Sequence, residues 1–306
     1  MIYVSISTIP QRLKHLIESV NSLLNQTRKP DKIFVNIPYK YKRFSETIED
    51  NQIPKFDSDI VEVTRCEDCG PGTKLLGSLN KSVESLLKQS KKPDKIFVNI
   101  PLKYKRFKET IDDNKIPKFD NRAVEITRCE DYGPGTKLLG SLNKFEKNSL
   151  VILVDDDHVY EDYMIEKFFY FYSKAANNAY SFYVHPLGNF GVGQGADGFA
   201  INSNSLNGVK KFYDEVVKTN KDLFIHDDLW TSFFLFYVKK IKIFSLQSHL
   251  RKTANNEISP IYKKHNQDNG LIESYGKNIN EAVRNRDQIS MQSLEYMFSK
   301  ISQIKF

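Results

Sequence analysis

An internal duplication constrains the fold of this chain more than any other feature. Residues 19–81 and 82–144 align without a gap, and 50 of the 63 paired positions are identical. A period this long exceeds that of common solenoid repeats, and there are only two units. We therefore interpret the repeat as a tandem duplication of one structural segment and not as an array.

Each copy predicts the same order of elements. In the first copy we expect a strand at 32–37, a short strand at 61–64, and a helix opened at Thr73 by a Gly-Pro-Gly turn. The second copy repeats this order at the equivalent positions, with its helix starting at Thr136. Strands that alternate with helices indicate an α/β protein with a mostly parallel, doubly wound sheet.

Two copies compete for one place in such a sheet. Only one can lie beside both the first strand, at 1–7, and the apolar strand expected at 150–154. The second copy runs directly into the apolar strand, so we expect it to take that place. The first copy would then be an insertion at the edge of the sheet or beside it.

Three consecutive carboxylates, Asp155, Asp156 and Asp157, follow the apolar run at 150–154. The run predicts a buried strand of a mostly parallel sheet. Neighbouring carboxylates disfavour one another's ionisation, and a divalent cation with hard oxygen ligands, Mg²⁺ or Mn²⁺, removes that cost. Ligands of open α/β sheets bind beyond the carboxyl ends of strands. The triplet therefore indicates metal-assisted handling of a phosphate, with an acidic turn as the alternative.

Two further segments carry chemistry. Residues 133–137 place backbone N–H groups and the Lys137 ammonium at a helix start, which is a candidate anion site. Asp227 and Asp228 precede a helix expected at 229–238. One aspartate at a helix start is ordinary capping, but a second is more than a cap requires. A carboxylate here is a candidate general base for an acceptor hydroxyl.

The ordered set of motifs resembles glycosyltransferases of the GT-A fold from giant viruses, algae and bacteria. The resemblance rests on six segments of the chain: 7–12 (STIPQR), 99–101 (NIP), 131–139 (DYGPGTKLL), 154–157 (VDDD), 193–200 (GQGADGFA) and 225–230 (IHDDLW). It covers about residues 1–250 and implies a GT-A domain there. Residues 251–306 are rich in Asn, Lys and Gln and are expected to form a polar C-terminal extension with a helix at 279–301.

The resemblance also implies a donor site. Asp157 would hold Mn²⁺ or Mg²⁺ on the diphosphate of a nucleotide sugar, a UDP-sugar being favoured. Asp155 would lie near the ribose or sugar of the donor and also serve as a metal ligand. Asp156 would contact the donor or point away from it. His249 or His265 would be a further metal ligand, because GT-A enzymes often complete the metal site with a C-terminal histidine; a solvated histidine is the alternative. The other residues expected to bind the donor are Arg12, Asp131 and Lys137.

On the acceptor side, the resemblance places the base at the acidic pair. We favour Asp228 over Asp227, because a first-turn side chain can project into the site while a cap residue binds backbone. Asp197 and Trp230 are expected to contact the acceptor, although a lone tryptophan in an amphipathic helix is more often a core residue. The implied activity is transfer of a hexosyl or related group to a glycan or protein hydroxyl, with the downstream aspartate as base if the enzyme inverts.

Two other functions stay open. A nucleotidyltransferase also uses metal-bound carboxylates behind a strand, but residues 7–10 lack the glycine-rich loop that would follow its first strand. A non-catalytic protein is the other alternative, either a glycan-binding protein or a degenerate glycosyltransferase whose sheet the duplication has disrupted.

The composition of the chain limits the classes of partner that it is expected to bind. The net charge is +7, but Lys and Arg are spread without a block of five, which favours a solvated basic surface over a nucleic-acid footprint. Cys66 and Cys69 form a C-x-x-C that the second copy lacks, because Tyr132 replaces the second cysteine. No apolar stretch approaches the roughly 20 residues that span a bilayer. We expect no membrane span, no nucleic-acid partner and a cytoplasmic location, in the host cytoplasm if the protein is viral.

Overall fold

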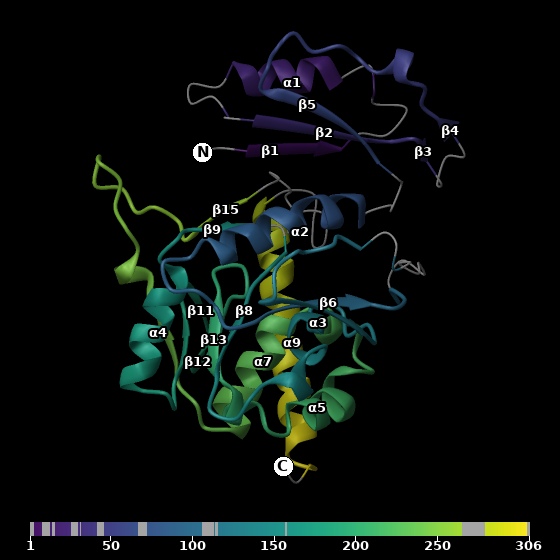
Figure 1. Ribbon diagram of the computed structural model, residues 1–306. Coiled ribbons are helices and arrows are strands. Elements are labelled where there is room, and N and C mark those ends of the chain that lie inside the picture. Colours follow the sequence, from purple (N-terminus) through teal and green to yellow (C-terminus); the bar gives the residue numbers. More distant parts are fainter. Residues whose placement is uncertain are drawn as a thin grey trace. The chain divides into compact units, whose positions relative to one another are not determined.

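The computed structural model divides the chain into two compact units (Figure 1). Unit 1 comprises residues 1–85, 156–159 and 263–267, and unit 2 comprises the rest. The structure describes residues 3–7, 13, 16–25, 30, 32–41, 46–66, 72–105, 113, 116–156, 158–264 and 279–304. The first division, after residue 85, falls close to the repeat boundary at 81/82, so each copy belongs almost entirely to its own unit.

Unit 1 is built on a parallel three-stranded sheet. It contains β1 (Tyr3–Ser7), β2 (Lys32–Pro38) and β5 (Val61–Cys66), in the order β1-β2-β5. Alternate residues of β2 are apolar, so that one face of the strand carries the core. Helix α1 (Leu16–Leu24) packs its buried residues, Leu16 and Val20, with that face. The remaining described elements of the first copy before α2 are β3 (Lys40–Tyr41), β4 (Glu46–Thr47) and the 3-10 turn η2 (Asp50–Gln52).

The first strand pairs with the first copy, not with the second. Ser5 of β1 lies opposite Phe34 of β2 in parallel register. The expectation that the second copy lies beside the first strand is therefore wrong. Strands that follow one another along the chain usually become neighbours, and β1, α1 and β2 form one direct β-α-β connection.

Unit 2 contains the equivalent strand pair from the second copy. Strands β6 (Ile96–Pro101) and β7 (Val124–Cys129) are parallel, and Ile96 lies opposite Val124. The first copy pairs Ile33 with Val61, which is the same register at the equivalent positions. Near-identical sequences therefore form the same local β structure in both units.

One stretch that is identical in the two copies forms helices of different length. In the first copy, residues 72–81 lie in α2 (Gly72–Leu87). In the second, the equivalent residues 135–144 include the single turn α3 (Thr136–Leu139) and the 3-10 turn η4 (Leu142–Lys144). The helix starts expected near Thr73 and Thr136 are confirmed. The next residues of each copy decide the length: Ser-Val-Glu-Ser-Leu-Leu continues the helical pattern after Lys81, whereas Phe-Glu-Lys-Asn-Ser after Lys144 leads into a strand.

The larger sheet of unit 2 is mixed. Its order is β14-β10-β13-β8, formed by β8 (Leu150–Leu153), β10 (Ala179–Ser181), β13 (Phe199–Asn202) and β14 (Ile243–Ser245). Only β10 and β14 are parallel; β13 runs antiparallel to both of its neighbours. The α/β class is confirmed in its general form, but the described strands form several sheets instead of one doubly wound sheet.

Strand β8 differs from the parallel strand that we expected. It pairs antiparallel with β13, and its burial alternates, with Val151 and Leu153 inward. The expectation was wrong because a short apolar run indicates a buried strand without specifying the direction of its partner. The acidic residues after β8 nevertheless lie at its carboxyl end, as the sequence required.

Unit 2 is completed by helices and short sheets around one apolar core. Three helices supply much of that core: α5 (Val209–Phe212), α7 (Asp227–Phe233) and α9 (Ile279–Ile301). Strands β11 (Val184–Leu187) and β12 (Phe190–Gly193) form a hairpin. The other elements of unit 2 are α4 (Met164–Lys174), η5 (Ser203–Leu206), the π-helical η6 (Tyr213–Val217), α6 (Lys221–Phe224), the π-helical η7 (Phe234–Val238) and η8 (Gln247–His249). Strands β9 (His158–Tyr160) and β15 (Tyr262–Lys264) each have two residues, 158–159 and 263–264, in unit 1.

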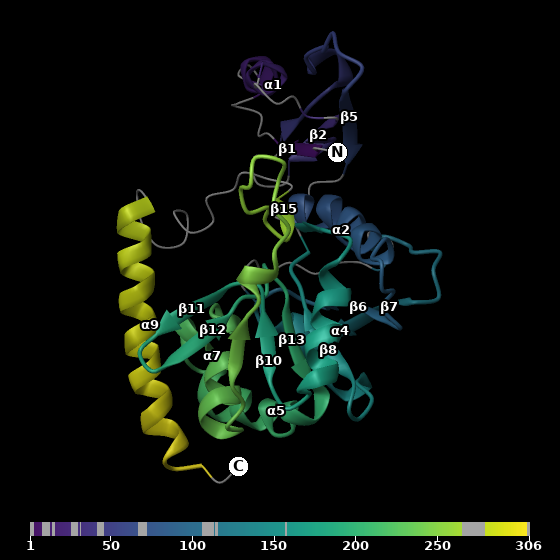
Figure 2. The same cartoon turned by 90° about the vertical axis from the view of Figure 1, so that its left-hand side faces the viewer.

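The C-terminal helix belongs to this core. Leu294 and Met297 of α9 are buried in it, and Figure 2 shows α9 running along one side of unit 2 beside β11. His185 of β11 approaches Asp287 of α9, with Nε2 3.9 Å from Oδ1. The expected helix is confirmed, and it packs into the domain. In the described part of the chain, no helix has the length and apolar character needed to cross a membrane.

Candidate functional site

Carboxylates from two distant segments converge on the ammonium of Lys137 in unit 2. Lys137 lies in α3, and its Nζ is 2.5 Å from Oδ1 of Asp155, which follows β8. The same Nζ is 3.1 Å from Oδ2 of Asp227, the first residue of α7. The residues predicted as donor site and as base therefore meet around one lysine.

Asp228 completes the cluster through a glycine. Its Oδ1 accepts a hydrogen bond of 2.9 Å from the backbone N–H of Gly195. A Cβ at position 195 would lie 2.4 Å from Lys137 Nζ and 3.2 Å from Asp228 Oδ1. Any other residue there would require the end of the Lys137 side chain to shift. Sequence reasoning did not single out Gly195, although the G-x-G-x-x-G spacing of 193, 195 and 198 was the available signal.

The acidic pair lies inside the helix start and not before it. His226 is the N-cap of α7, and Asp227 and Asp228 are its first two residues. Neither aspartate is therefore the cap, which corrects the expectation that one of them would bind the helix backbone. The side chains are left to make the contacts with Lys137 and Gly195.

Burial and neighbouring charges set the protonation of this cluster. Burial, together with the nearby Asp227 carboxylate, raises the pKa of Asp228 to about 8. Burial alone would lower the pKa of Lys137, but the carboxylates of Asp155, Asp227 and Asp228 outweigh it and raise that pKa well above its ordinary value. Lys137 is therefore a fixed cation, whereas the Asp228 carboxyl changes its charge near neutral pH.

Asp131 shapes the loop that carries Lys137. Its Oδ1 accepts from the N–H of Gly133 at 2.8 Å and its Oδ2 accepts from the N–H of Lys105 at 2.7 Å. Gly133 has a φ of +63°, and a Cβ there would lie 2.5 Å from the carbonyl oxygen of Phe224. Both oxygens of the buried Asp131 carboxylate thus hold backbone in place, which is a structural task beside the donor-binding role that we predicted.

The structure separates other predicted residues from the cluster. Trp230 is fully buried and packs edge-on against Tyr213, with ring centroids 5.8 Å apart. The expected stacking of Trp230 on an acceptor is therefore wrong, because neither face of the ring is open. His249 is exposed and places its ring 4.7 Å from that of Phe171; the described contacts do not bring it to Asp155.

Four more residues were predicted to lie in the site. Asp197 is half-buried and follows Gly195 by two positions. The carbonyl oxygen of Asp156 accepts a hydrogen bond of 2.7 Å from Ser82 Oγ, within unit 1. Asp157 and Arg12 lie outside the described residues, and so does the alternative metal ligand His265.

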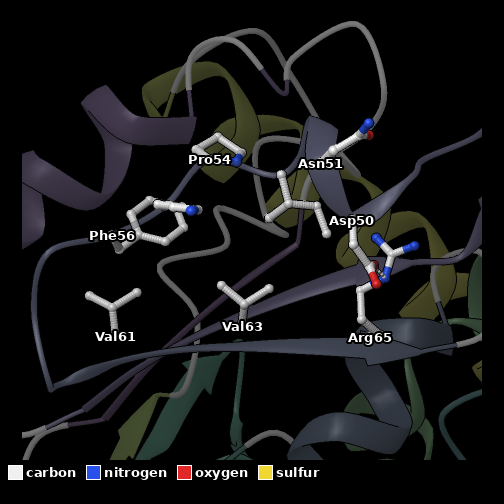
Figure 3. A pocket seen from close by; sticks show the side chains of 9 residues that line it. Asp50, Asn51, Pro54, Phe56, Val61, Val63 and Arg65 are labelled. Carbon is white, nitrogen blue, oxygen red and sulfur yellow. Dashed lines mark ion pairs between the residues drawn. The ribbon is translucent and has the colours of Figure 1, made fainter.

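Unit 1 carries an open groove of about 520 Å³ (Figure 3). Two of its charged side chains point toward each other: Arg65 Nε is 3.2 Å from Asp50 Oδ1. Arg65 also donates a hydrogen bond to the carbonyl oxygen of Ile48. The rest of the lining is largely apolar and includes Phe56 and Val63. Sequence reasoning did not single out this groove, and none of the predicted site residues lines it.

No protein-family model matches this chain, and no curated protein sequence matches it either. The functional interpretation therefore rests on the residues of the cluster and on the ordered motifs that supply them.

Among the described residues, the cluster offers the ligand type of a hard divalent cation but no formed three-ligand centre. Asp155, Asp227 and Asp228 offer carboxylate oxygens, the ligand type that Mg²⁺ and Mn²⁺ prefer, and they face a single ammonium. In the part of the chain that the structure describes, these carboxylates converge on Lys137, and no three His, Cys, Asp or Glu side chains form a ready metal centre. Asp155 is the described candidate ligand, with its side chain 32% exposed.

Proposed function

We propose that this protein is a metal-dependent glycosyltransferase of the GT-A type. It would move a sugar from a nucleotide sugar, a UDP-sugar being favoured, to a hydroxyl of a glycan or protein acceptor. The observation that carries the proposal is the convergence of Lys137, Asp155 and the Asp227–Asp228 pair. The order of the sequence motifs supports the same assignment.

Asp228 is the proposed general base. Its carboxyl is held by the Gly195 N–H, and its pKa of about 8 lies near the range in which a base is most effective. In an inverting reaction, Asp228 would take the proton from the acceptor hydroxyl while that oxygen bonds to the anomeric carbon of the sugar. The bond from this carbon to the donor diphosphate breaks at the same time, and the nucleoside diphosphate leaves. Asp227 instead forms an ion pair with Lys137, and its negative charge helps to keep the lysine protonated. The two aspartates therefore have different roles: Asp228 as base, Asp227 as partner of the lysine.

Asp155 and Asp157 are the proposed holders of Mn²⁺ or Mg²⁺. The bound ion would supply positive charge that stabilises the departing nucleoside diphosphate. Lys137, which keeps its proton, would add positive charge toward the phosphates of the donor. Asp197 remains the proposed contact for acceptor hydroxyls.

The proposal predicts that Asp157→Ala abolishes sugar transfer and leaves the fold intact. The measurement is turnover of a panel of nucleotide sugars with Mn²⁺, for the wild type and the variant. Asp94→Ala, which removes an exposed carboxylate, is the control and should keep full activity.

Transfer at the wild-type rate by the Asp157→Ala variant, or by the wild type in excess EDTA, would contradict the proposal. Release of pyrophosphate from a nucleoside triphosphate would indicate the nucleotidyltransferase instead. Donor binding without turnover across a broad panel of acceptors would favour the non-catalytic alternative.

A further inference from the structure

Lys137 occupies the position of a counter-cation in the acidic cluster. Its Nζ bridges two carboxylates from different segments, at 2.5 Å from Asp155 and 3.1 Å from Asp227. The lysine side chain is only 17% exposed, and that of Asp227 is 11% exposed. Charges this poorly hydrated are stable only when paired, so the carboxylates of the cluster need the Lys137 ammonium as their partner.

The ion pair and a metal compete for one carboxylate. Oδ1 of Asp155 is already engaged by Lys137, and a divalent ion on the same carboxylate would stand close to the ammonium. Like charges at such a separation repel strongly where water is scarce. The Lys137 ammonium also lies close to the backbone of Gly195, since a Cβ built there would stand 2.4 Å from Nζ. The ammonium therefore has little room beside a bound ion.

We infer that Lys137 is a tethered competitor of the metal: its ammonium holds Asp155 in an ion pair, and it must leave Asp155 before a divalent cation is bound there. This inference rests on the proposed metal-dependent function, because it concerns the same site. Its consequence is that metal affinity is set low by the protein's own lysine. The released ammonium is then free to contact the phosphates of a donor.

The duplication supplies a matched control. Lys74 stands in the first copy within 70–81, a segment identical in sequence to 133–144, which contains Lys137. Lys74→Met therefore repeats the chemical change of Lys137→Met in an identical local sequence. Lys137→Arg tests charge alone, because it keeps a cation at the cluster.

Calorimetric titration with Mn²⁺ tests the inference in the full chain without measuring catalysis. We expect Lys137→Met to bind Mn²⁺ at least about 10-fold more tightly than the wild type, because the competing charge is gone. Lys137→Arg and Lys74→Met should bind it as the wild type does. Equal or weaker binding by Lys137→Met would overturn the inference.

A second measurement uses the wild-type protein and so does not depend on the folding of a variant. Acetylation of lysines, followed by mass spectrometry, should modify Lys137 several-fold faster when saturating Mn²⁺ is present. Lys144 is the internal control: its Nζ is 2.5 Å from Oε1 of Glu125, and its labelling should not change. Unchanged labelling of Lys137 with Mn²⁺ would contradict its release.

These outcomes separate the inference from the function. Metal-dependent sugar transfer by the wild type, combined with unchanged Mn²⁺ affinity in Lys137→Met, would overturn the inference and leave the proposed function standing. Tighter Mn²⁺ binding by Lys137→Met in a protein that transfers no sugar would support the inference and count against the activity. No Mn²⁺ binding by either protein would overturn both.

Discussion

Asp228 is the residue whose chemistry depends most on its surroundings. An aspartate on a helix start in water would be charged at every physiological pH. Here burial and the neighbouring Asp227 raise its pKa to about 8, while the Gly195 N–H fixes its orientation. Sequence alone placed a carboxylate at this point of the chain. It did not reveal the shift, because burial of Asp228 depends on segments that are distant along the chain.

A base with this pKa predicts the pH dependence of transfer. Below about pH 8 the Asp228 carboxyl holds a proton and cannot accept another, so kcat/KM should rise with pH and level off above that value. Asp228→Asn should lower kcat/KM by roughly 10²–10⁴-fold and remove the rise. Steady-state kinetics from pH 5 to about 9.5 measure both effects. The same pH profile in the variant and the wild type would exclude Asp228 as the base.

The raised pKa of Asp228 also predicts how the free energy of unfolding changes with pH. This change can be measured without catalysis and is the control for the kinetic result. Between the ordinary pKa of 3.8 and the folded value of about 8, the folded protein holds a proton that the unfolded chain has lost. The free energy of unfolding should therefore fall as pH rises through this range. Asp228→Asn should show a smaller fall in urea titrations at several pH values, and it should fold, because asparagine can still accept from Gly195.

At the scale of elements, the predictable features were those with a local cause. The apolar pattern located β2, β6 and β8, the Gly-Pro-Gly turns located the starts of α2 and α3, and a helix was expected where α9 lies. The length of α2 and the shortness of α3 depend on the residues that come after an identical sequence. The antiparallel partner of β8 was not predictable, because β13 belongs to a distant part of the chain.

The close packing of α3 against α7 gives a prediction at this scale. A Cβ at Gly135 would lie 2.6 Å from Cζ2 of the buried Trp230. Gly135→Ala should therefore lower the free energy of unfolding by about 1–3 kcal/mol, measured by urea denaturation. Gly72→Ala is the matched control in the first copy, where the same change falls in the first turn of α2. An equal loss of stability in both variants would show that the contact with Trp230 is not the cause.

At the scale of the whole molecule, the duplication determines which local elements form twice, but it makes the pairing of the first strand ambiguous in the sequence. Two copies with the same strands satisfy the same sequence pattern, so the pattern cannot decide which copy pairs with β1. Chain connectivity decides: β1 joins the first copy, whereas Lys137 of the second copy meets Asp155. The sequence motifs named the members of the acidic cluster. Their union around one lysine, and the burial of Trp230, required the structure.

The most direct test of the central claim is whether the cluster binds a nucleotide sugar together with a metal. The thermal unfolding midpoint should be measured for the full chain with a panel of nucleotide sugars, with and without Mn²⁺, for the wild type, Asp155→Asn and the control Asp94→Asn. We predict that a UDP-sugar raises the midpoint only with Mn²⁺, in the wild type and in Asp94→Asn but not in Asp155→Asn. Absence of any shift in the wild type with Mn²⁺, or an equal shift in Asp155→Asn, would contradict the proposed donor site.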